Sequence, residues 1–207
     1  MKDQSGLEAL SEEEYKADFL QDEDPKKARR AFEKAWEIRN FEIEMYWKRA
    51  TYFWAFIASA FVGYFSVSSV DDPDPDAIFI LVCIGIILSV AWFFTNKGSK
   101  SWQRHWEVHV DLLEDRFTGP LYKTVYPAKT FSVSKINEIV SACFIWIWVV
   151  LGIKFFMDYL DDLNLVIVVL GFLVVAVSLY HMAFGKGRGR FSERAVQMHR
   201  RKVSYKK

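Results

Sequence analysis

The chain has 207 residues, of which 52% are apolar and 26% charged, with a formal net charge of only +1. This total hides a strong separation of charge, because residues 1–24 hold nine acidic and two basic side chains, whereas residues 185–207 hold nine basic and one acidic. The apolar content excludes a disordered chain, and the long uncharged runs argue against an ordinary soluble domain. We therefore expect an all-α, polytopic membrane protein.

Residues 1–24 form an acidic N-terminus that we expect to be mostly disordered. Within it, Ser11 followed by Glu14 has the form of a capping box, which could start a short helix carrying Tyr15 and Phe19. The negative charge of this segment leaves two interpretations open. It is either a solvated tail or one half of a salt-sensitive latch that pairs with the basic residues 185–207.

Residues 25–117 are predicted to form a cytoplasmic helix, a transmembrane hairpin and a return helix. Pro25 suits the first position of a helix. The uncharged runs at about 50–70 and 77–95 contain 21 and 19 residues, and a bilayer core needs about 20 as a helix. Four aspartates and two prolines fill residues 71–76 between them, so this loop should end one helix and start the next.

Both cytoplasmic helices of this hairpin are predicted to be amphipathic, so that their aromatic faces pack together as stalks. The helical period defines one apolar face before the hairpin and one after it. The residues assigned to stalk packing are Phe32, Trp36, Trp102, Trp106, Val110 and Leu113. Gly119 and Pro120 should end the return helix.

The remaining chain is predicted to contain a cytoplasmic connector, residues 118–138, and a second transmembrane hairpin, residues 139–184. Ser132 and Ser134 are candidate N-caps for its first helix. The chain thus has four transmembrane helices in two hairpins, of which the first carries long cytoplasmic helical extensions. Residues 185–207 form a basic cytoplasmic tail.

Basic residues also predict the orientation and the partner of the tail. They are concentrated on the flanks of the hairpins and almost absent from the two short loops, which places both termini in the cytoplasm. Lys186, Arg188 and Arg190 are therefore expected to contact anionic lipid. Charge alone does not distinguish the phosphates of lipid from those of RNA, so nucleic acid stays a less favoured alternative for this tail.

Two histidines are the only residues with metal-ligand spacing that we single out. His105 and His109 lie at i and i+4 on one helical face, which suits a divalent metal. Their surroundings lack the H-E-x-x-H order of metalloproteases, and solvated or interfacial histidines are the favoured interpretation. We find no nucleophile with a partnered histidine and no paired intramembrane carboxylates, so we expect no cofactor and no enzymatic activity.

Small residues form ridges along the first two spans. Spacing by four or three residues aligns one set on each span: Ala55, Ser59, Gly63 and Ser66 on the first, and Gly85 and Ser89 on the second. Intramolecular packing of the first hairpin is one interpretation. The alternatives are contacts between copies of the chain, or a narrow pore lined by Ser59 and Ser66.

Residues 36–51 (WEIRNFEIEMYWKRAT) and 96–107 (NKGSKSWQRHWE) resemble a group of small, largely uncharacterised bacterial inner-membrane proteins. The order helix, two spans, helix over residues 25–120 also resembles the two-span effector modules of bacterial anti-phage and nucleotide-signalling systems. The chain departs from these modules in carrying a second hairpin.

The resemblance implies a multi-pass inner-membrane homo-oligomer. Such an effector conducts ions or disrupts the membrane when a cytoplasmic defence-system protein or a small nucleotide signal acts on it. The competing hypothesis is a non-conducting scaffold or sensor that recruits a cytoplasmic enzyme.

Overall fold

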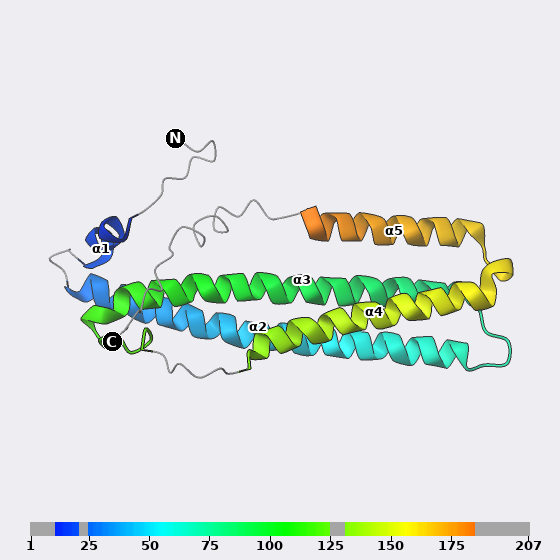
Figure 1. Cartoon of the computed structure of the whole chain (residues 1–207), viewed down its shortest axis with the longest axis horizontal. Coiled ribbons are helices and arrows are strands. Elements are labelled where there is room, and N and C mark those ends of the chain that lie inside the picture. The colour runs from blue at the N-terminus through cyan, green and yellow to red at the C-terminus, as the bar shows by residue number, and fades with distance from the viewer. Residues whose placement is uncertain (1–10, 21–24, 125–130, 185–207) are drawn as a thin grey trace, which may run out of the picture. The chain divides into compact units, whose positions relative to one another are not determined.

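A computed structural model describes residues 11–20, 25–124 and 131–184 (Figure 1), and every regular element among them is helical. The α-helices are α1 (Glu12–Leu20), α2 (Pro25–Ser68), α3 (Pro75–Leu113), α4 (Val133–Tyr159) and α5 (Leu165–Phe184), with short 3-10 turns at Glu114–Arg116 and Leu160–Asp162. Four of them, α2 to α5, are long and apolar enough to cross a membrane. The predicted all-α polytopic class is confirmed.

Two helix starts agree with the capping residues that the sequence predicts. Helix α1 occupies nine residues of the segment expected to be mostly disordered, because the Ser11 hydroxyl accepts from the Glu14 N–H at 3.1 Å while Glu14 accepts from the Ser11 N–H at 2.7 Å. Helix α4 begins at Val133, six residues before the predicted start of the third span at residue 139, because the Ser132 side chain caps it by accepting from the Lys135 N–H. The candidate cap at Ser132 is therefore confirmed.

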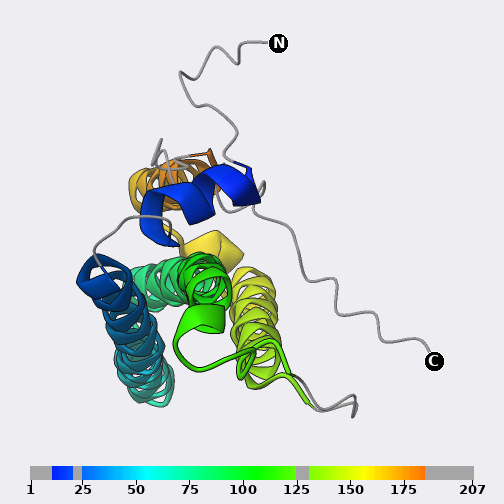
Figure 2. The same cartoon turned by 90° about the vertical axis from the view of Figure 1, so that its left-hand side faces the viewer.

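The chain divides into two compact units, and α2 and α3 contribute to both. Among the described residues, the first unit comprises 11–20, 25–45 and 99–124, and the second comprises 46–98 and 131–184. In the second unit, α2, α3 and α4 run alongside one another (Figures 1 and 2), and their buried side chains form one apolar cluster.

The core of the first unit joins α1 to the parts of α2 and α3 that lie outside the predicted spans. Tyr15, Ala35, Val110 and Leu113 are buried at its centre. After α3 the chain reverses through Gly119, whose φ of 65° lies in the left-handed region that glycine tolerates.

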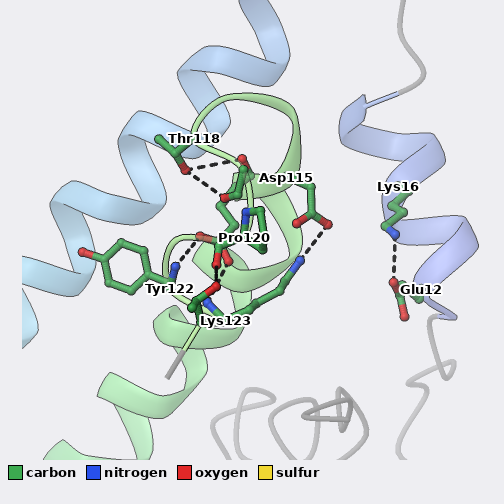
Figure 3. Close-up of polar contacts among 10 residues, drawn as sticks. Glu12, Lys16, Asp115, Thr118, Pro120, Tyr122 and Lys123 are labelled. Atoms are coloured by element: carbon green, nitrogen blue, oxygen red, sulfur yellow. Dashed lines mark hydrogen bonds and ion pairs between the residues drawn. The ribbon is translucent and has the colours of Figure 1, made fainter. Parts of the chain in front are cut away.

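Buried Glu114 holds this reversal, since its carboxylate accepts from the N–H groups of Tyr122 at 2.7 Å and Lys123 at 3.1 Å. Figure 3 shows the reversal together with the ion pair between Lys123 and Asp115 at 2.7 Å. The turn thus returns Tyr122 to α2, where its ring meets Trp36 with centroids 4.8 Å apart.

Helix α3 makes a close contact with α4 at Gly85. A Cβ atom added there would lie 2.1 to 2.6 Å from the fused ring atoms of Trp148. We expect Gly85→Ala to destabilise the second unit by about 1–3 kcal/mol, because the indole has no room to move within a packed core. Thermal unfolding of the detergent-solubilised protein, followed by tryptophan fluorescence, measures the change.

Gly98→Ala is the matched control, because it makes the same change in the same helix where no atom lies within 4 Å of the added Cβ. The control should stabilise the helix by about 0.5–1 kcal/mol. Equal effects of the two substitutions would contradict the close contact at Gly85.

Candidate functional site

The small residues on the first span of α2 differ in their exposure. Ala55, Ser59 and Ser66 are exposed in the single chain, and the Ser59 hydroxyl donates to the Ala55 carbonyl at 2.9 Å. Gly63 is half-buried, and a Cβ added there would lie 3.1 Å from the Leu81 side chain. Only Gly63 of this ridge therefore packs within the chain, and the other three residues form an uncovered face.

The small residues of the ridge on α3 are covered by other parts of the same chain. Gly85 lies against Trp148 of α4, and Ser89 is completely buried. Both positions therefore serve packing of helices within the second unit. A substitution at Gly85 would report on this internal contact before it reported on assembly.

A buried polar network joins three helices of the second unit. The Asn137 amide donates to the Tyr46 hydroxyl at 2.8 Å and to the Asn96 side-chain oxygen at 3.1 Å. Asn96 in turn donates to the Asn137 carbonyl and to the Ser141 hydroxyl, each at 3.4 Å. Such bonds can hold transmembrane helices together, since an unpaired polar group in hydrocarbon is costly.

Sequence reasoning missed this network. Asn96 and Asn137 both lie just outside predicted spans, and neither belongs to a motif with known spacing. The signal in the sequence was that each asparagine lies at the end of an apolar span. That position does not identify a hydrogen-bond partner. These residues fix the register of α4 against α3.

In the first unit, His109 is held by α1. The Tyr15 hydroxyl lies 2.7 Å from His109 Nδ1, and Tyr15 is only 2% exposed. Burial, and then the neighbouring imidazole of His105, lower the pKa of His109 to about 4. The imidazole is therefore neutral at pH 7, and one of its nitrogens serves the contact with Tyr15.

The pair His105 and His109, the less favoured metal candidate, has no third potential ligand beside it among the described residues. The rings of His105 and His109 are 4.7 Å apart between centroids, but no group of three or more potential ligands occurs in that part of the chain. Two imidazoles alone fall short of the three protein ligands typical of catalytic zinc.

Five of the six residues assigned to stalk packing lie in or against one apolar cluster. Phe32, Trp36 and Trp106 pack around buried Val110 and Leu113. Trp102 is the exception and needs a correction, because it is 39% exposed.

The physical reason for this exception is the register of the buried stripe. This stripe runs through Ser99, Gln103, Trp106, Val110 and Leu113 in alternating steps of four and three residues. Trp102 falls one residue away from it.

The basic tail was predicted to contact anionic lipid. Lys186, Arg188 and Arg190 lie outside the described residues, and their role stays a prediction.

Comparison with known proteins gives one finding. A model described as the octameric membrane protein family (8xMP) matches residues 29–157, which include nearly all of α2, the whole of α3 and most of α4. No curated protein and no solved structure matches the chain.

We expect the packing of α1 to weaken on acidification. The pKa of His109 is about 4 when packed and about 6.5 in an unfolded chain, so the unpacked state binds more protons between these values. Stability is therefore full above about pH 6.5 and falls as the pH drops towards 4, by up to about 1.4 kcal/mol per unit. Hydrogen exchange of residues 12–20 at pH 7.5 and 5.0, corrected for intrinsic rates, measures this loss of stability.

The control is His109→Gln, which keeps a polar side chain but does not titrate. Its exchange protection should be lower at pH 7.5 and should change less between the two pH values. If the substituted protein lost as much protection on acidification as the wild type, another group would be responsible.

Proposed function

The chain belongs to the octameric membrane protein family, whose model matches more than half of its residues, and on this premise we propose that its oligomer acts as a gated pore or membrane-perturbing effector. The protein is an oligomeric membrane protein with four helices able to span a bilayer. The family's description makes eight the oligomer number to expect.

The uncovered face of α2 supports this proposal. Ala55, Ser59 and Ser66 are exposed together with Val62, whereas Ile57, Ala60 and Tyr64 on the other side of the helix are buried. Small side chains allow the backbones of neighbouring helices to approach closely. Lipid can cover an exposed face of a spanning helix, but in the proposed oligomer this face meets a neighbouring copy or lines a central pore.

The hydroxyl groups on this face suit both surroundings. Ser59 donates to its own helix, and so does Thr51, to the Trp47 carbonyl at 3.0 Å. Neither hydroxyl is an unpaired donor, so contact with lipid or protein carries no large desolvation cost. The hydroxyl oxygens can still accept from water, and a small conformational change could therefore convert a dry contact into a wet pore lining.

The location and trigger belong to the same proposal. The resemblance to bacterial effector modules supports the inner membrane and a role in anti-phage defence, with no catalytic activity of the chain's own. Basic residues at one end of the spans support cytoplasmic termini. A cytoplasmic defence protein or a small nucleotide would then act on the first unit.

The non-conducting scaffold remains the second candidate. The first unit favours it, because helix α1, the reversal after α3 and the Trp36 region form a folded surface that a soluble enzyme could recognise. Ion flux separates the two candidates, since a scaffold leaves gradients intact.

We expect Ala55→Leu to disrupt assembly through the exposed face of α2. The larger side chain holds neighbouring helices apart without touching the buried side of the helix, so both the oligomer mass and flux should fall. Light scattering of the purified protein measures the mass. Release of potassium and of carboxyfluorescein from proteoliposomes measures conduction, for which we expect at least a tenfold reduction.

Ala176→Leu is the matched control, because it makes the same change at an exposed position of α5. It should preserve both mass and flux. Loss of assembly in the control alone would place the contact on α5, and intact gradients around assembled wild-type protein would favour the scaffold.

A further inference from the structure

Helix α4 begins with an exposed apolar surface. Phe131, Val133 and Ile136 are 92%, 57% and 48% exposed, and they precede the residue at which the third span is predicted to start. A helix turn in bulk water normally carries polar side chains on its open side. These three residues, which we call the α4 entry surface, therefore need an apolar covering.

The polar network sets the depth of this surface. Asn137 bonds to Asn96, which follows the last residue of the predicted second span. The entry surface therefore lies beyond the end of that span, level with Lys97 and Gly98. Helix α4 has 27 residues, or about 40 Å at 1.5 Å per residue, which exceeds the hydrocarbon thickness of about 30 Å.

The end of the second unit that carries the entry surface is mainly basic. Among the described residues, its charged side chains are Lys48, Arg49, Lys97, Lys135 and Glu138. The opposite end, with both short loops, carries seven aspartates and one lysine. The exposed Lys97 ammonium lies over the Phe93 ring, 4.4 Å from its centroid, which holds a positive charge at this depth.

We propose that the α4 entry surface, together with Lys97 and Lys135, binds the headgroup region of anionic phospholipids. Apolar side chains flanked by lysines are typical of helices that lie in the membrane interface. Phe131, Val133 and Ile136 contact the upper acyl chains, and the two ammonium groups meet the lipid phosphate. In water, these apolar side chains would stay uncovered. The opposite end of the second unit is rich in aspartates, so it lacks the positive charge that would attract an anionic headgroup.

The test uses the full-length protein incorporated into vesicles of equal phosphatidylglycerol and phosphatidylcholine. After extraction in mild detergent, native mass spectrometry gives the ratio of the two lipids retained by the oligomer. The wild type should retain phosphatidylglycerol preferentially. Lys97→Gln and Lys135→Gln should each lower that ratio about fivefold, and Lys135→Arg should preserve it.

Lys154→Gln provides the control, since it removes one positive charge from the other end of α4 and should leave the ratio unchanged. Equal ratios in wild type and both lysine variants would overturn the proposal, as would an equal loss in the control. A second copy is the competing occupant. If Ile136→Ser reduced the oligomer mass while the lipid ratio stayed constant, the surface would be a contact between copies.

Discussion

The indole of Trp148 is the contact on which the packing of the second unit depends. It lies against Gly85 of α3, stacks on Phe61 of α2 with centroids 4.4 Å apart, and meets Tyr64 edge-on at 5.9 Å. In a bilayer the helices gain little from leaving lipid for one another, so association depends on close fit and on hydrogen bonds. One large side chain seated on a glycine supplies that fit for three helices at once.

As a result, one side of α2 packs in the core of the subunit and the other side is exposed. The side that faces Trp148 carries Phe61 and buried Tyr64. The opposite side exposes the small residues Ala55, Ser59 and Ser66 next to the large exposed side chains of Tyr52, Val62 and Phe65. A single subunit is therefore complete in its own core, yet it presents a surface that suits another helix. Oligomerisation can then proceed without opening the subunit core, which is consistent with membership of an octameric family.

Much of this fold follows from local chemistry in the sequence. Uncharged runs identify the spans, because a charge in hydrocarbon is costly, and Pro25 and Ser132 mark helix starts through their backbone preferences. The pairings were not predictable. Periodicity gives a helix a face but not a neighbour, so Trp102 was assigned to a stripe that passes one residue away, and the bond between Tyr15 and His109 joins residues 94 positions apart.

The bond between Asn96 and Asn137 also bears on how the protein is made. Synthesis delivers the first hairpin to the membrane before α4, so Asn96 and Tyr46 must stay hydrated at the interface until Asn137 arrives. Their amide and hydroxyl groups are then withdrawn from water together. The network that joins the two hairpins can therefore form only after α4 has been inserted, and a chain that lacks α4 leaves Asn96 and Tyr46 without these bonds.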